Sequence, residues 1–298
     1  MTVYSPATQR LIEREHRRLL VRRARQLILF LLLLAVILWG ASNYLADHFT
    51  FAWTKPISVL LVAVMDPHTD FVDGARQDFL HRFLSGTTPT QGNVGGIESW
   101  FQREHERATG LGQKPLEITV RGPIKVKAPP PAPPASNASF LERWRGTAGF
   151  LGYFEGIGKE NQLLLEAYDI VLFVYFFDEM ETKKYVGQHS VATRRTRRGV
   201  VFSPLGPRHI DRCCALVGHE LCHTLGATDK YEGERSVFPD GFAEPNRIPL
   251  YPQDQAEIMA LGIPINKGSE RRVEGLTDCV IGRKTREEIG WKGLPSNR

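Results

Sequence analysis

The sequence predicts a mixed α+β domain, in which a twisted mixed sheet packs against one long helix, preceded by a single membrane-spanning helix. Three observations lead to this prediction. Residues 26–46 form an uncharged stretch near the N-terminus, and two later runs, 57–66 and 168–177, are apolar on both faces that a strand presents. Further on, residues 210–225 place apolar side chains at helical spacing.

Residues 26–46 are expected to cross a lipid bilayer as a helix. At about 1.5 Å per residue, these 21 residues span roughly 31 Å, close to the hydrocarbon thickness of a membrane. Residues 27–39 are all apolar, which disfavours a helix in the core of a soluble domain, because such a helix keeps a polar face. A cleaved signal peptide is the alternative. The long basic region before the apolar run and the lack of a small-x-small cleavage site favour an uncleaved signal anchor.

Charge is distributed asymmetrically about this segment. Residues 1–26 contain seven Arg and two Glu, whereas the other 272 residues balance 31 basic against 31 acidic groups. The positive-inside rule therefore predicts that residues 1–25 are cytoplasmic and that 47–298 form an extracytoplasmic domain, periplasmic if the cell is Gram-negative. Because the net charge of +5 resides in the N-terminal arm, a nucleic-acid partner is not expected.

Local patterns predict the other elements of the domain. A helix is expected over 69–84, where apolar residues recur every fourth position, and another over 95–109. Residues 116–127 alternate like a strand, and a capping box that starts at Ser139 predicts a helix to about Phe154.

Two further strands are expected at 185–193 and 199–203. Arginine-rich residues 194–198 would join them as a solvated hairpin. By strand order, residues 185–193 are expected at the edge of the sheet.

Candidate metal-binding and catalytic residues occur together in residues 216–231, LVGHELCHTLGATDKY. His219 and His223 are four positions apart, so on a helix they lie one above the other and can share a metal ion. Glu220 lies about 100° round the same helix, beside the open coordination position. Gly226 is suited to end the helix in a left-handed conformation. The opposite face carries an apolar stripe that should pack on the sheet, formed by Ile210, Cys214, Val217, Leu221 and Leu225.

This segment resembles the extended zinc motif, HExxHxxGxxD, of metzincin-type metallopeptidases. The Asp-ending form is similar to that of snapalysin, and HTLGATDKY is similar to the helix end of immune-inhibitor-A-type peptidases. The resemblance covers about residues 200–291 and implies a zincin fold. It also implies Zn²⁺ held by His219, His223 and Asp229, with Glu220 as the general base.

The same resemblance extends to a turn and to a methionine. It implies that Gly226 turns the chain so that the third ligand reaches the metal. Met259, in AEIMALG, resembles the methionine that these enzymes place in a tight turn beneath the zinc. Leu261 stands where metzincins have a tyrosine, so this sequence departs from the pattern there.

A second route to the third ligand stays open. In thermolysin-like enzymes a Glu about twenty residues beyond the second His binds zinc, and Glu244 lies 21 residues after His223. A glycine at position 226 has no special role in that arrangement. We therefore predict Asp229 as the ligand and keep Glu244 as the alternative.

The four cysteines also allow two interpretations. Outside the cytoplasm a disulfide is permitted, and Cys279 is the available partner for Cys213, Cys214 or Cys222. Cys222 itself is too far along the helix to pair with Cys213 or Cys214. The alternative is four buried thiols that pack as small apolar groups.

These patterns together predict a membrane-anchored zinc metalloendopeptidase, whose partners are a protein or peptide substrate and, through residues 26–46, the lipid bilayer. Zinc would activate water and polarise the scissile carbonyl, and Glu220 would move the proton from the water to the leaving amine. An extended substrate could pair with the edge strand at 185–193.

Two other functions compete with this prediction. The first is an anchored, non-enzymatic binding or scaffold protein with a vestigial zinc site. Glu220 argues against it, because metal binding alone does not need that carboxylate. The second is a zinc amidase that acts on cell-wall peptides.

Overall fold

The structure is a computed structural model of the 298-residue chain. The residues that it describes are 6–48, 51–69, 83, 94–131, 139–179 and 190–291. The predicted helix over 69–84 falls almost entirely outside them, as do residues 185–189 of the predicted edge strand. The chain divides into two compact units, Met1–Phe49 and Thr50–Arg298.

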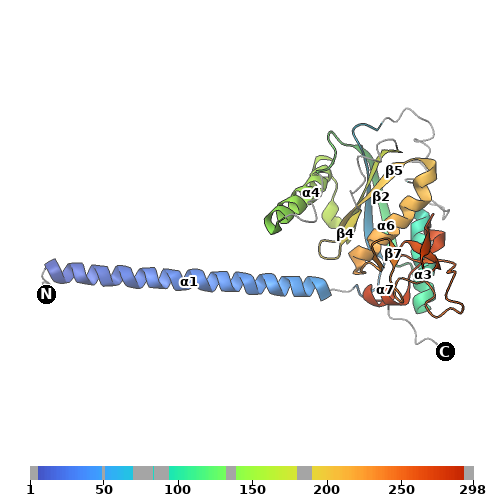
Figure 1. Cartoon of the computed structure of the whole chain (residues 1–298). Helices are drawn as coiled ribbons and strands as arrows, with labels where there is room; N and C mark the ends of the chain where they lie inside the picture. Colours follow the sequence, from blue (N-terminus) through green and yellow to red (C-terminus); the bar gives the residue numbers. More distant parts are fainter. Residues whose placement is uncertain are drawn as a thin grey trace. The chain divides into compact units, whose positions relative to one another are not determined.

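The N-terminal unit is one continuous helix, α1 (Pro6–His48), which is 43 residues long (Figure 1). Within it, Arg17–Ala41 is long and apolar enough to cross a membrane, and a signal sequence would meet the same criteria. The predicted N-terminal apolar helix is therefore confirmed. The orientation of this helix in the membrane and the absence of its cleavage stay predictions.

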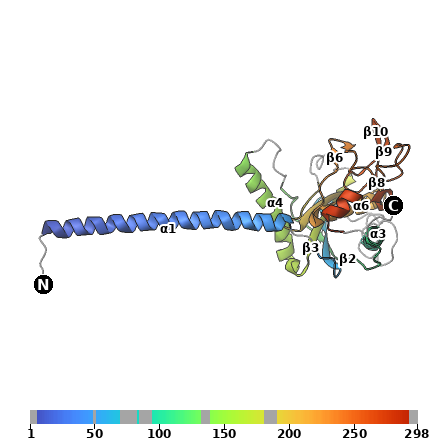
Figure 2. The ribbon, with the colours of Figure 1, turned by 90° about the horizontal axis from the view of Figure 1, so that it is seen from below.

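The second unit is built on a five-stranded mixed sheet in the order β2-β1-β3-β5-β4 (Figures 1 and 2). Four strands are parallel, namely β1 (Ile57–Met65), β2 (Leu116–Lys125), β3 (Ile170–Asp178) and β5 (Arg198–Leu205). The short strand β4 (Val191–Thr193) lies at the edge and pairs antiparallel with β5. The antiparallel edge strand makes the sheet mixed, as predicted.

Helices cover both faces of this sheet. Alternate residues of β1 enter two different cores, because successive side chains of a strand point to opposite faces. Val59 and Leu61 pack with α3 (Val94–Thr109) and α6 (Ile210–Leu225). Leu60 and Val62 pack with α4 (Phe140–Glu160). This helix lies on the other side of the sheet from α6 (Figure 1). Burial in these two cores explains why the run at 57–66 is apolar on both faces of the strand.

The helix α4 starts at the predicted capping box. The Glu142 amide donates to Ser139 Oγ at 3.4 Å, and the Ser139 amide donates to Glu142 Oε2 at 2.9 Å. The helix runs to Glu160, so the predicted end near Phe154 is too early. Ile157, one turn further on, is buried against the sheet, and this packing outweighs the low helix propensity of the glycines around it.

The C-terminal part contains mostly short elements. The strands are β6 (Tyr231–Glu232), β7 (Arg235–Ser236), β8 (Ala256–Glu257), β9 (Gly262–Asn266), β10 (Ser269–Arg272) and β11 (Cys279–Val280), and the last helix is α7 (Arg283–Glu288). Single turns of 3₁₀ helix are η1 (Leu165–Ala167), η3 (Pro207–His209) and η4 (Leu276–Asp278). All four cysteines are buried and free, which agrees with the thiol interpretation and not with a disulfide to Cys279.

Candidate metal centre

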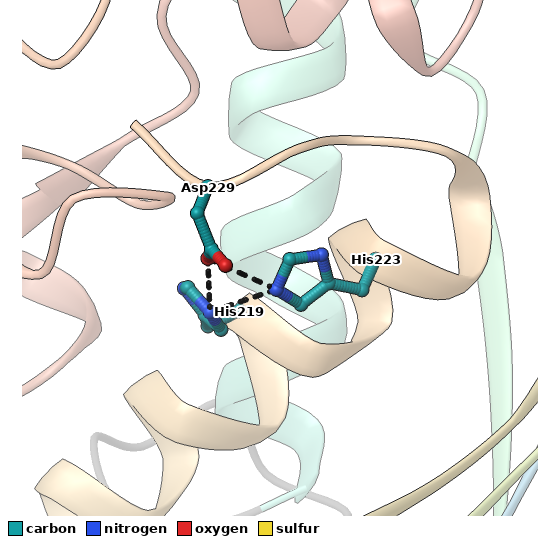
Figure 3. Close-up of side chains that lie close together, drawn as sticks. All are labelled: His219, His223 and Asp229. Carbon is teal, nitrogen blue, oxygen red and sulfur yellow. Dashed lines mark hydrogen bonds and ion pairs between the residues drawn. The ribbon is translucent and has the colours of Figure 1, made fainter. Parts of the chain in front are cut away.

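The helix α6 carries the two histidines and ends at a residue that has to be glycine. Gly226 adopts a left-handed conformation, with φ of 114°, and its amide donates to the carbonyl of Cys222 at 3.0 Å. A Cβ atom at this position would also lie 3.0–3.1 Å from the side chain of Arg194. The turn reverses the chain and brings Asp229 back over the helix (Figure 3).

Three side-chain atoms converge at this turn. The Nε2 atoms of His219 and His223 are 3.1 Å apart, and Asp229 Oδ1 lies 3.3 Å from the first and 3.1 Å from the second (Figure 3). Ligands at about 2.0–2.1 Å from a tetrahedral ion lie about 3.3 Å from one another. The triangle therefore has the size that a metal ion requires, and this group could hold one.

The outer nitrogens of both imidazoles are fixed by backbone carbonyls. His219 Nδ1 donates to the carbonyl of Ile258 at 3.0 Å, and His223 Nδ1 donates to that of Ala227 at 2.9 Å. A proton on each Nδ1 leaves Nε2 as the atom that can bind a cation. The hydrogen bonds thus select the tautomers that bind a cation.

The charge of Asp229 also suits a cation. Burial alone would raise the pKa of its carboxyl, but the neighbouring imidazoles of His219 and His223 outweigh burial and hold that pKa well below its ordinary value. For His223 burial lowers the pKa, but the contact with Asp229 and the charge of Glu220 outweigh burial and raise that pKa. The third corner of the triangle is therefore an ionised carboxylate.

Glu220 lies beside the triangle rather than in it. Its side chain is buried, and Oε2 forms no hydrogen bond with any residue in the part of the chain that the structure describes. Burial raises its pKa to about 6, against the opposing effect of His219 and His223. Buried carboxylate oxygens are normally hydrogen-bonded, so this oxygen is free to accept a bond from a water molecule or another ligand.

A buried ion pair holds the segment that presents Asp229. Lys230 Nζ lies 2.7 Å from Glu288 Oε2 and donates to the carbonyl of Thr228 at 2.8 Å. The Thr228 amide and hydroxyl donate to the same Glu288 carboxylate at 3.0 and 3.1 Å. Residues on both sides of Asp229 are thus tied to α7. The sequence analysis missed this pair, because its members are 58 positions apart.

Met259 is buried in a turn that follows β8, and its resemblance to the methionine of the metzincin turn stays a prediction. The carbonyl of the preceding residue, Ile258, accepts the bond from His219, and the Met259 carbonyl accepts one from the Lys230 amide at 3.0 Å. The buried carboxylate of Glu257 accepts the Met259 amide at 2.6 Å. Leu261 closes the turn with φ of 55°.

Tyr231 lies close to the triangle, whereas Glu244, the alternative ligand, lies away from it. Burial together with the charges of Asp229 and Glu220 raises the pKa of Tyr231, which the sequence analysis did not select. Its place two residues after Asp229 was the available signal. Glu244 is exposed and pairs with Arg247 at 3.4 Å. The structure brings Asp229, and not Glu244, to the histidines.

Comparisons with known proteins give little further information. No family model matches the chain, and no curated protein matches it. Among solved structures, OgpA from Akkermansia muciniphila matches at 14% sequence identity with a TM-score of 0.32, over 62% of this chain and 53% of that one. The chain thus spans about half the length of OgpA. The match is too distant to show a family.

Proposed function

We propose that this protein is a membrane-anchored zinc metallopeptidase of the zincin type, which cleaves peptide bonds outside the cytoplasm. One observation carries the proposal. A triangle of two imidazole nitrogens and one carboxylate oxygen, 3.1–3.3 Å on each side, stands next to a buried carboxylate, Glu220, with an unpaired oxygen. Metal binding alone needs only the triangle, whereas hydrolysis also needs a base within reach.

In this proposal His219, His223 and Asp229 hold Zn²⁺, which supplies Lewis-acid chemistry at the scissile carbonyl when bound. Glu220 Oε2 takes a proton from the attacking water and returns it to the nitrogen of the leaving amine. The fixed Nδ1 bonds of the histidines keep their rings in place during this cycle.

Tyr231 and β4 have roles toward the substrate in the same proposal. The Tyr231 hydroxyl, next to Asp229 and Glu220, donates a hydrogen bond to the carbonyl oxygen of the substrate as negative charge develops there. An extended peptide pairs with the outer edge of β4, the terminal strand of the sheet.

Substitution of Glu220 by Gln tests the proposal. Full-length protein in detergent should retain one zinc per chain, because the three ligands are unchanged, while its peptidase activity should fall by about 10²–10⁴-fold because proton transfer is lost. Zinc content by elemental analysis and cleavage of a quenched fluorescent peptide library, with and without a chelator, measure both quantities. Glu234→Gln, an exposed carboxylate in the turn between β6 and β7, is the matched control.

Two results would contradict the proposal. If Glu220→Gln cleaves as fast as the parent, Glu220 is not the base. If the zinc-loaded parent cleaves no peptide in the library, the non-enzymatic binding protein replaces the peptidase as the better explanation of the site.

A further inference from the structure

A hollow lies beside the N-terminal half of α6. It has a volume of about 420 Å³, within the range of sites that bind small ligands. Its apolar wall includes Phe177 at the end of β3, Phe202 on β5 and Leu216 on α6. Two cationic side chains, Arg212 on α6 and Arg272 at the end of β10, line it as well. We refer to the space between these five residues as the Arg212 pocket.

Neither arginine forms an ion pair with an acidic side chain in the described part of the chain. Arg212 is half-buried, and within the described ranges neither guanidinium forms a hydrogen bond or an ion pair with another residue. Burial and the positive charge of Arg272 lower the pKa of Arg212, and the carboxylate of Glu274 only partly offsets them. Two cations that share a hollow in this way are stabilised when an anion binds between them.

The pocket retains an excess of positive charge. Among its described lining residues the acidic one is Glu179, whose Oε1 lies 3.3 Å from His209 Nε2. With that carboxylate beside an imidazole, two guanidinium groups remain for a ligand. Guanidinium groups bind carboxylates and phosphates through paired hydrogen bonds, and the aromatic and aliphatic wall suits the carbon atoms that carry such an anion.

The Arg212 pocket lies on the same stripe of α6 as the metal centre. Arg212, Leu216, His219 and His223 are spaced at i, i+4, i+7 and i+11, which places them on one face of a helix. Seven residues from Arg212 to His219 correspond to about 10.5 Å along the helix axis. An extended peptide advances about 3.3 Å per residue. A side chain about three residues from the metal would therefore reach the pocket.

We propose that the Arg212 pocket binds an acidic side chain, Glu or Asp, of the substrate peptide, at a position about three residues from the scissile bond. This inference rests on the proposed peptidase function and adds a substrate class to it. Arg212 and Arg272 are specificity-determining residues, which contact the substrate away from the reacting atoms.

Peptide series that differ at one position test the preference. Full-length, zinc-loaded protein is given peptides with Glu, Gln or Lys at each position up to four residues on either side of the cleaved bond. Wild type should cleave the Glu peptide about tenfold faster in kcat/KM than its Gln counterpart, at one position about three residues away. In Arg212→Met and Arg272→Met the ratio of the two rates should fall to within about twofold.

Two further variants separate charge recognition from general damage. Arg212→Glu should reverse the preference, so that the Lys peptide becomes the better substrate. Arg121→Met, an exposed arginine on β2, should keep the wild-type preference. If Arg212→Met cleaves the Glu and Gln peptides with the wild-type ratio, the assignment of the pocket is wrong.

Binding measurements keep this test independent of catalysis. Zinc-loaded Glu220→Gln protein is titrated with fluorescent Glu and Gln peptides and, as a competitor, with inorganic phosphate. Tighter binding of the Glu peptide that depends on Arg212, in a protein whose parent cleaves nothing, would support the pocket and reject the peptidase. Cleavage without any acidic preference would reject the pocket and keep the peptidase. Arg212-dependent binding of phosphate without a preference for the Glu peptide would overturn the substrate assignment in favour of a free anion.

Discussion

Asp229 supplies the ionised oxygen of the candidate metal centre, and a measurement of zinc content distinguishes it from Glu244, the alternative ligand. We predict that Asp229→Ala largely abolishes stoichiometric zinc at neutral pH, because a direct ligand is lost, whereas Glu244→Ala leaves about one zinc per chain. Elemental analysis of the purified full-length variants measures this difference. The opposite pattern would make the site thermolysin-like, and retention in both would mean that another ligand is involved.

Tyr231 allows a test at the scale of a single hydroxyl group. Tyr231→Phe removes the hydroxyl near Asp229 and keeps the ring, so bound zinc should be unchanged. If the hydroxyl donates to the substrate carbonyl in the transition state, kcat should fall by about 100-fold with a smaller change in KM. Steady-state kinetics on one cleaved peptide separates the two constants. An unchanged kcat would mean that Tyr231 does not contact the reacting carbonyl.

At the scale of elements, the helix α7 stabilises the segment that presents Asp229. Glu288→Gln removes the charge that pairs with buried Lys230 and weakens the bonds to Thr228. We expect the affinity for zinc to fall by about 10–100-fold, as is typical when a group that orients a ligand is lost. Competition with a chelator of known affinity measures the change.

The neighbouring residue of α7 provides the control. Glu287→Gln alters an exposed carboxylate, 3.8 Å from Arg283, and should leave the affinity for zinc unchanged. Thermal unfolding of the metal-free proteins distinguishes a positioning role from general destabilisation. If Glu288→Gln lowers the melting temperature but binds zinc as tightly as wild type, α7 does not position Asp229.

At the scale of the whole molecule, the arginines before the apolar part of α1 predict which side of the membrane holds the second unit. A reporter that is active only outside the cytoplasm, fused after Arg298, should be active, and the protein should stay with membranes after an alkaline carbonate wash. An inactive reporter would reverse the topology. Release of the protein from the membrane would indicate a cleaved signal peptide instead.

Local sequence patterns were sufficient to predict the structure of several parts of this protein. The spacing of His219 and His223 fixes their relative position on a helix, whatever surrounds it. The apolar runs of β1 and β3 are buried on both faces, as expected for central parallel strands, and the capping box sets the start of α4. In each case the interacting residues are close in sequence, or the pattern repeats along one element.

Tertiary structure decided the rest. The sequence left Asp229 and Glu244 as alternatives, because the third ligand follows a turn whose direction depends on φ at Gly226. The ion pair of Lys230 with Glu288 and the Arg212 pocket join segments far apart in the chain. The sequence by itself thus determined the relative positions of the two histidines and Glu220 on one helix, and the central strands, through short-range geometry. Long-range packing, which no local pattern encodes, decided which carboxylate completes the site and which cations lie beside it.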